Sequence, residues 1–260
     1  MEHRLRPLLA TARMSALEQN YFGLGEAIGS YAIRALRLLA LISLFTALFS
    51  QGAGAGGMTL PMLLRYTVVS VALSDLLDVR TLASSWMHEG SILSQYMRPM
   101  GIFPQLAAHT TGGWITPFLL FSLPVMLISS VLGINVLPQS PWFFVSLALS
   151  ISLGFATDFL FACLVIRMQN AAWLVEVIRR AITALLSGAV IPFALLPWGI
   201  GDILALSPFA SQAGAALSLF TGLAGAKEVL PLQVFWNLLL WPAALILFNR
   251  SRERMVPHGG

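Results

Sequence analysis

The stretch PWFFVSLALSISLGFATDFLFACLVI, residues 141–166, decides the class of fold. Its only charged side chain is the carboxylate of Asp158. About 20 consecutive, largely apolar residues suffice for a helix to cross the hydrocarbon core of a bilayer. This stretch therefore predicts a transmembrane helix that carries one acidic group inside it.

The rest of the chain has the same apolar character. Of its 260 residues, 57% are hydrophobic and 10% are charged, and the mean hydropathy is +0.81. An average soluble domain has roughly 25% charged residues. No hydrophilic block is long enough to form a second core, so we expect a single all-α transmembrane domain over residues 1–260.

Working outward from residues 141–166, further apolar stretches predict a total of six transmembrane helices. The expected ranges are 37–51, 58–79, 104–133, 141–166, 171–198 and 232–249. The first range is short, so its membrane part is expected to begin before Arg37. Residues 199–231 are apolar but interrupted by glycine and proline, which predicts short re-entrant or interfacial helices against the bundle or a water-filled cavity.

The positions of the basic residues predict the orientation. All but two of the 15 Lys and Arg residues fall beside one side of the predicted spans, and the exceptions are Lys227 on the other side and Arg65 within a span. Cytoplasmic loops carry the excess of Lys and Arg. Both termini are therefore expected in the cytoplasm, with residues 1–33 and 80–101 on that side and residues 199–231 outside. The same residues are scattered over short loops, which does not favour a nucleic-acid partner.

A glycine-rich stretch, GAGAGGMT at residues 52–59, has the spacing of a phosphate-binding loop. Met58 stands where that motif needs a lysine, and the expected context is an external hairpin rather than a strand followed by a helix. The four histidines have no paired carboxylate or nucleophile at a recognisable spacing. We therefore expect no catalytic site, metal or cofactor in this chain, so that any ATP and Mg²⁺ would be bound by another subunit. The lone Cys163 is expected to pack within a span.

Two charged residues fall within predicted spans. Charges at this depth cost about 2.5–3.5 kcal/mol on insertion scales and are by default functional hypotheses. Counting along straight helices places Arg65 and Asp158 at depths that differ by only several ångströms, so they could pair along a translocation path. The alternative is a structural role, with the arginine extending to the membrane surface and the aspartate hydrogen-bonded within the bundle.

The stretch LLSGAVIPFALLPWGIG, residues 185–201, places two prolines and several glycines in the outer half of the fifth predicted span. Proline removes a backbone donor and clashes with the preceding turn, so this part must bend. Gly188, Pro192 and Pro197 are candidate gate residues. The alternative is a helix that ends at Pro197, and periodicity does not separate the two.

The polar segment HEGSILSQYMRPMG, residues 88–101, lies between two apolar spans and ends in a helix-breaking Arg98-Pro99. It could be a solvated interfacial loop or a helix that contacts a soluble partner. As such a helix, it would carry Glu89 to meet a basic residue, and an exposed apolar stripe of Ile92 and Tyr96. Pro99 would turn the chain sharply into the third span.

Residues 57–101, which contain GSIL (90–93) and YMRP (96–99), resemble the second span and following cytoplasmic helix of permease subunits of ABC exporters of the ABC-2 class. Residues 186–222 are similar to that family's progression of Ser-Gly-x-x-x-Pro, then Pro, then Leu-Pro-Phe, with Ser207 in place of the leucine before Pro208-Phe209. The resemblance covers most of residues 50–250.

The resemblance implies a six-helix permease subunit of an ATP-driven exporter, in the bacterial cytoplasmic (inner) membrane. Its partners would be two separately encoded cytoplasmic ATPase subunits, which bind ATP and Mg²⁺, and a second copy of the chain or a homologous permease. Expected ATPase-coupling residues are Glu89, Gly90, Ile92, Leu93, Tyr96, Arg98 and Pro99. Expected residues of the gate and translocation path are Arg65, Asp158, Gly188, Pro192, Pro197 and Pro208.

Two other classes of function stay open. An ion-coupled secondary transporter or channel usually has several carboxylates within the membrane or paired broken helices. Here only Asp158 and one broken span fit that pattern. A membrane protein that serves assembly without transport is the third possibility. The sequence does not indicate which substrate is carried.

Overall fold

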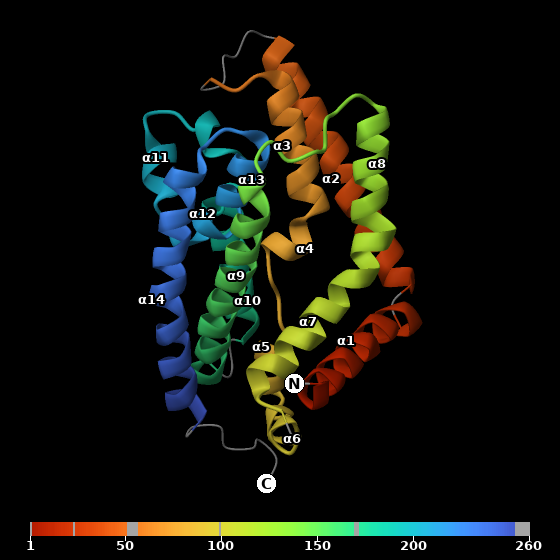
Figure 1. Ribbon diagram of the computed structural model, residues 1–260, viewed down its shortest axis with the longest axis vertical. Coiled ribbons are helices and arrows are strands. Elements are labelled where there is room, and N and C mark those ends of the chain that lie inside the picture. The colour runs from red at the N-terminus through yellow and green to blue at the C-terminus, as the bar shows by residue number, and fades with distance from the viewer. Residues whose placement is uncertain (1, 23, 51–56, 99, 169–171, 253–260) are drawn as a thin grey trace.

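The computed structural model describes residues 2–22, 24–50, 57–98, 100–168 and 172–252 (Figure 1). Within these ranges the regular elements are helices, as expected from the sequence. Four of them are long and apolar enough to cross a membrane: Ile28–Ser50, Ile102–Val131, Trp142–Arg167 and Ala226–Ser251. The chain is an all-helical, multi-pass membrane protein by these criteria.

The N-terminal region forms two helices. α1 (Glu2–Phe22) lies against α7 (Ile102–Pro117) at the lower end of the molecule, and α2 (Leu24–Ser50) runs from there to the upper end (Figure 1). α1 and α7 approach closely at Gly112, where a Cβ atom would overlap the backbone of Ala12. The first span indeed begins before Arg37, as expected.

The second predicted span, 58–79, is not one continuous helix. α3 (Leu60–Ala72) has 13 residues and α4 (Ser74–Leu77) has four. At 1.5 Å per residue, α3 is about 20 Å long, which is shorter than a hydrocarbon core of about 30 Å. Residues 78–82 then lead down to α5 (Ala83–His88) and α6 (Ile92–Tyr96) at the lower end (Figure 1).

The third predicted span is a continuous helical rod. α7 is followed by η1 (Phe118–Ser122), which has π-helical hydrogen bonding, and by α8 (Leu123–Val131). Pro117 immediately precedes η1, and Pro124 is the second residue of α8. Each proline lacks a backbone N–H donor, which favours irregular hydrogen bonding nearby. α9 (Trp142–Arg167) then descends through the bundle, and α14 (Ala226–Arg252) packs along it.

The prediction that residues 171–198 form one continuous helix, the fifth span, is wrong. α10 (Ala172–Leu186) ends before Gly188, and η3 (Phe193–Leu195) follows as a short 3₁₀ turn. The expected short helices are present between α10 and α14: α11 (Ile200–Ala205), α12 (Pro208–Gln212) and α13 (Gly214–Thr221). Because α12 and α13 pack against α9, they form part of the core.

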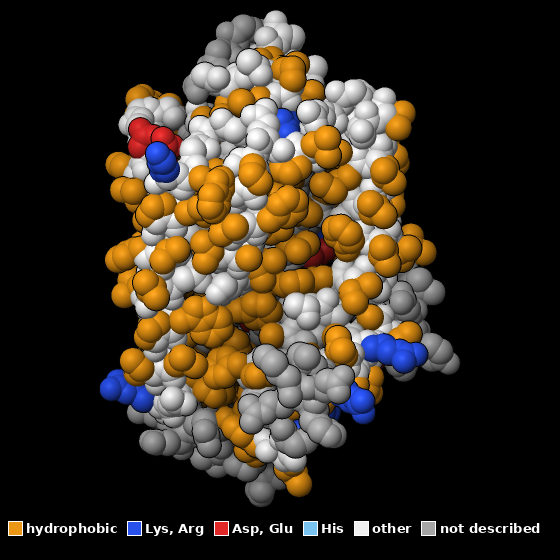
Figure 2. Space-filling view, viewed as in Figure 1, with side chains coloured by type: hydrophobic (Ala, Val, Ile, Leu, Met, Phe, Trp, Pro, Cys, Tyr) orange, Lys and Arg blue, Asp and Glu red, His pale blue; other side chains and the backbone are white. Residues whose placement is uncertain are grey.

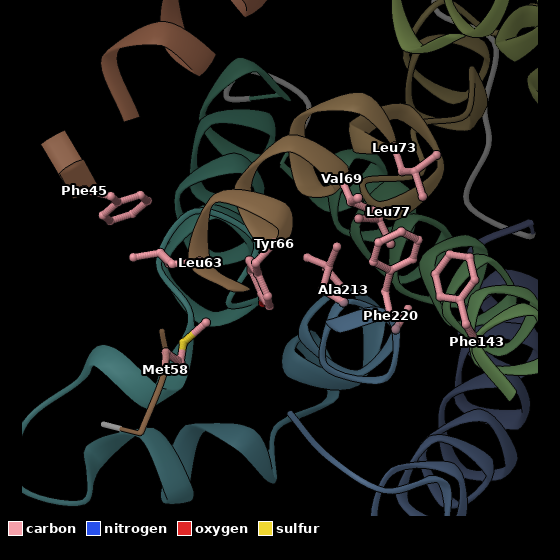
Figure 3. Close-up of a cluster of buried hydrophobic side chains, with 12 residues drawn as sticks. Phe45, Met58, Leu63, Tyr66, Val69, Leu73, Leu77, Phe143, Ala213 and Phe220 are labelled. Atoms are coloured by element: carbon pink, nitrogen blue, oxygen red, sulfur yellow. The ribbon is translucent and has the colours of Figure 1, made fainter. Parts of the chain in front are cut away.

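The main apolar core surrounds α3. Figure 3 shows its side chains between Phe45 of α2 on one side and Phe143 of α9 on the other. Met58, expected in an external hairpin, is buried in this core, while residues 51–56 lie outside the described ranges. Cys163 is buried in a second apolar cluster near the lower end, which confirms its packing role.

Candidate functional site: a charged cavity within the bundle

A cavity of about 1020 Å³ lies among α1, α2, α3, α4, α7 and α10. Figure 2 shows a hollow at mid-height on one face of the molecule, with an acidic side chain recessed in it and hydrophobic side chains around it. Charged and hydroxyl-bearing side chains contribute much of the lining. A polar cavity of this size within apolar helices is the strongest candidate for a functional site in the described residues.

The polar lining comes from stripes along otherwise apolar helices. α2 contributes Ser30, Arg34 and Arg37, α10 contributes Arg180 and Thr183, and Ser187 directly follows the last residue of α10. Residues three, four and seven positions apart share one face of a helix, so each set is directed to one side. α7 supplies a third group, which includes His109, Thr110, Gly113, Trp114 and Thr116.

An ion pair joins α2 to α4 at the cavity wall. Arg34 donates to both carboxylate oxygens of Asp75, with Nη1 2.5 Å from Oδ2 and Nη2 2.8 Å from Oδ1. Both side chains are partly accessible, at 29% and 24%. Because the contact is bidentate, it fixes the guanidinium in one plane. The same arginine lies 5.8 Å from the ring centroid of Phe121.

A second, more buried cluster is centred on Arg179 of α10. Its Nη1 lies 3.3 Å from Asp158 Oδ1 and 3.7 Å from Asp78 Oδ1, and it donates to the carbonyl of Val79 at 3.2 Å. Asp78 also accepts from Arg80. The side chains of Arg179 and Asp158 are only 3% and 4% exposed, so each depends on the other for charge compensation.

Asp158 does not pair with Arg65, so that hypothesis is wrong. Its Oδ2 instead accepts from the hydroxyl of Thr81 at 2.5 Å and from the backbone N–H of Thr81 at 3.1 Å. The depth estimate assumed that residues 58–79 form one straight span. Since α3 ends at Ala72, the loop after α4 lies beside the middle of α9 and meets Asp158 there.

Arg65 belongs to a separate contact at the upper end. It donates to the carbonyl of Leu137 and lies 5.0 Å from the ring centroid of Phe220. With the amide of Gln139 oriented to satisfy both of its groups, the Gln139 oxygen accepts from Arg65 at 2.9 Å and its nitrogen donates to the Thr221 carbonyl at 3.2 Å. Arg65 therefore ties α3 to the α8–α9 loop and α13 at the upper end of the molecule.

The break after α10 is supported by hydroxyls of α3. Tyr66 donates to the carbonyl of Gly188 at 2.8 Å, and Ser70 donates to that of Ala189 at 2.5 Å. Gly188 has a φ of +72°, and a Cβ atom there would meet the Phe193 ring. Irregular backbone within a bundle needs such partners. The break thus occurs at Gly188, whereas the helix has already ended before Pro192 and Pro197.

Pro208 has a local role in the short helices. It occupies the first turn of α12, and the preceding Ser207 caps that helix by accepting from the N–H of Ala210 at 3.1 Å. Proline suits this position because its missing donor is not needed there. Like the other residues predicted for the gate and translocation path, Pro208 is not among the residues that line the cavity.

The predicted coupling segment consists of two short helices at the lower end, separated by Gly90 with a φ of +73°. The prediction that Ile92 and Tyr96 form an exposed stripe is wrong, because Ile92 is fully buried in a cluster with Met87 and Phe159. The exposed apolar side chains of α6 are instead Leu93, Tyr96 and, just after it, Met97. Glu89 and Arg98 are also exposed, and Pro99 lies outside the described residues.

This segment is fastened to the start of α7. The Gln105 amide donates to the carbonyls of Gln95 at 2.9 Å and Met100 at 2.8 Å. Gln105 is fully buried. A displacement of α6 would therefore also move α7, whose residues from His109 onward line the cavity.

Sequence reasoning missed most of the cavity wall. Arg34, Arg37, Arg80 and Arg180 were counted as charges beside the spans, although they line the cavity. For Arg34, Arg37 and Arg180 the signal is the three-, four- and seven-residue spacing of polar residues along α2 and α10, whereas Arg80 lies in the loop after α4, where no such spacing applies. A scan against protein-family models, a search of curated proteins and a search of solved structures each gave no match.

Proposed function

We propose that this chain is the transmembrane subunit of an ATP-driven exporter and that its substrate passes through the charged cavity. The observation that carries the proposal is a cavity of about 1020 Å³ with charged walls inside a bundle of apolar helices. Ionisable groups within membranes are costly and commonly mark a substrate or ion path. An apolar core alone would serve a purely structural protein better.

The proposed topology has six passes and both termini in the cytoplasm of a bacterium. The ends of α1 and α14 share the lower end of the molecule, where α9 ends at Arg167 and the last turn of α14 contains Arg250 (Figure 1). Lys227 lies at the opposite end of α14. α3 to α5 and α10 are the second and fifth passes, and their breaks are tolerated because neighbouring side chains satisfy the backbone.

Energy would come from a separate cytoplasmic ATPase that binds ATP and Mg²⁺. The exposed Glu89, Leu93 and Met97 offer a contact surface at the lower end. Gln105 connects that surface to α7, and α7 carries His109 and Trp114 of the cavity wall. Movement of the ATPase would thus alter the cavity through one short series of contacts.

A second permease copy, identical or homologous, completes the proposed complex. α2 and α10 border the cavity and also expose apolar side chains, among them Ile33, Leu36, Val177 and Leu185. A partner permease on these helices would enclose the charged stripes, which lipid cannot solvate.

The proposal is tested by isolating the chain from its native membrane with its partners. The expected result is co-purification of a soluble ATPase, with hydrolysis by the complex and none by the separated chain. Nucleotide hydrolysis by the contaminant-free chain, or full transport without any ATPase, would contradict the proposal.

A second candidate function, ion-coupled transport, is favoured by one observation. Asp158, Asp78 and Arg179 form a buried charged cluster beside the cavity, and such clusters relay protons or ions in secondary transporters. Reconstituted vesicles separate the two candidates. Uptake driven by a proton or sodium gradient without ATP supports the carrier, whereas uptake that needs the ATPase and ATP supports the exporter.

A further inference from the structure

We propose that the cavity binds the headgroup of a zwitterionic amphiphile: a molecule with an ammonium group, a nearby phosphate or carboxylate, and an apolar tail. This inference deepens the proposed function by naming a substrate class. Binding itself can be measured without any ATPase.

The charges in the wall of the cavity and directly behind it are close to balanced. The wall itself contains four arginines (Arg34, Arg37, Arg80 and Arg180) and three carboxylates (Glu18, Asp75 and Asp78), with His109 beside Glu18, while Arg179, Asp158 and Glu176 lie behind it. Apart from His109, the basic and acidic groups are therefore equal in number. A ligand with net charge would add an uncompensated charge to a poorly solvated site. A zwitterion avoids this cost because it exchanges one set of ion pairs for another.

The ion pairs at the surface of the cavity are accessible for such an exchange. The side chains of Arg34 and Asp75 are about a quarter exposed, and that of Arg80, which pairs with Asp78 in the same loop, is 53% exposed. The Arg34–Asp75 pair joins two different elements, with Arg34 on α2 and Asp75 on α4. An ammonium group at Asp75 and an anionic group at Arg34 would replace this contact and separate the two helices slightly.

The cluster also holds an acceptor without a hydrogen bond. Oδ1 of Asp78, a lining residue, is buried and receives no hydrogen bond, although Arg179 Nη1 lies 3.7 Å away. Leaving such an atom unsatisfied is costly. An ammonium donor would supply the missing bond once the surrounding side chains move apart to expose Oδ1, and Trp114, which also lines the cavity, has a ring face that suits a methylated ammonium.

The hollow lies at mid-height among hydrophobic side chains rather than at a polar end of the molecule (Figure 2). Ile33 and Leu36 of α2, which borders the cavity, are exposed, and so are Leu119 and Leu120 of η1, which directly follows α7. A headgroup could therefore occupy the cavity while its tail stays against apolar surface.

The test compares three probes with the same acyl chain on the purified full-length protein in nanodiscs. The probes are lysophosphatidylethanolamine, which is zwitterionic, lysophosphatidylglycerol, which is anionic, and a long-chain amine, which is cationic. Displacement of a fluorescent zwitterionic lysolipid gives the affinities. The zwitterionic probe is expected to bind at least about tenfold more tightly than the others, the equivalent of one charge-assisted hydrogen bond.

The double variant Arg34→Gln with Asp75→Asn keeps the net charge and should weaken the zwitterionic probe about tenfold. The charge exchange Arg34→Asp with Asp75→Arg keeps an ion pair but swaps the positions of its two charges. This variant therefore shows whether a loss of binding reflects a loss of the fold. Glu228→Gln, near the opposite end of α14 and away from the cavity, is the matched control and should leave affinity unchanged. Equal affinity for the three probes, or folded cavity variants with unaltered affinity, would overturn the inference. Failure to recover an ATPase would instead count only against the exporter.

Discussion

At the scale of single residues, Arg179 is the side chain on which the charged cluster depends. It is almost fully buried and faces Asp158, Asp78 and Glu176 at 3.3 to 3.7 Å. Removing one partner of a buried ion pair leaves an uncompensated charge, which costs more than the pair contributes when intact. The buried pair of Arg179 and Asp158 should therefore behave as a unit under mutation.

Arg179→Gln is expected to lower the free energy of unfolding by about 3–5 kcal/mol, because Asp158 loses its buried counter-charge, whereas Asp78 keeps its contact with Arg80. Adding Asp158→Asn should recover part of this loss. Denaturant titration of the four proteins of the cycle in mild detergent gives the coupling energy. Arg65→Gln combined with Asp158→Asn is the control and should be additive, since these residues have separate partners.

Gly188→Ala is expected to destabilise the protein by about 1–3 kcal/mol, because the backbone there has a positive φ and the new methyl group would meet Phe193. Pro197→Ala should cost under about 1 kcal/mol, since the helix has already ended at Leu186. The stability and the transport activity of the two variants are compared by thermal unfolding and by a transport assay. A larger effect of Pro197→Ala would restore the interpretation of the prolines as the gate.

At the scale of helices, length and apolarity predicted the four long ones, while the short ones depend on tertiary contacts. The ends of α3 and α10 are set partly by the bonds from Tyr66 and Ser70 to the backbone after α10. These bonds join residues more than a hundred positions apart, so no local pattern reveals them. The wrong pairing of Asp158 with Arg65 has the same cause. Its partners in the structure are Arg179 on α10 and Thr81 after α4, and the predicted spans in these two regions were longer than the helices observed.

The burial of α6 was also hidden from sequence reasoning. A pair spaced four apart identifies one face of a helix but not which face is packed. Ile92 faces the core and Leu93 faces outward, so the phase of the helix was wrong by about one residue. The general position of the segment at the lower end remains compatible with an ATPase contact.

Leu93→Glu together with Met97→Glu is expected to preserve the fold, since surface substitutions usually change stability by less than about 0.5 kcal/mol each. If the segment contacts an ATPase, the variant should lose that partner or its transport-coupled hydrolysis. Pull-down and hydrolysis measured on the same preparation test this. Ile92→Asp is the contrasting variant and should unfold the lower core, at a cost of roughly 4 kcal/mol.

At the scale of the whole molecule, the topology can be tested with the chain's lone cysteine removed. Cys163 is buried among apolar side chains, so Cys163→Ala provides a background with only a modest loss of packing. New cysteines in place of Lys227 and Arg250 lie near opposite ends of α14. An impermeant thiol reagent added to intact cells should label position 227 and should reach position 250 only after the cells are opened. Labelling of both positions from outside would contradict the proposed orientation.

The shortness of α3 has an electrical consequence. Its 13 residues are about 20 Å long, and below it the chain borders the charged cavity rather than continuing as an apolar helix. With water in the cavity, the insulating layer at this place is about two-thirds as thick as the surrounding bilayer. The membrane voltage then falls over a shorter distance above the cavity, and the local field is correspondingly stronger. If the cavity is the substrate path, as proposed, substrate charges that leave it upward cross most of that voltage in one step, and a substrate with no net charge crosses it at little electrical cost.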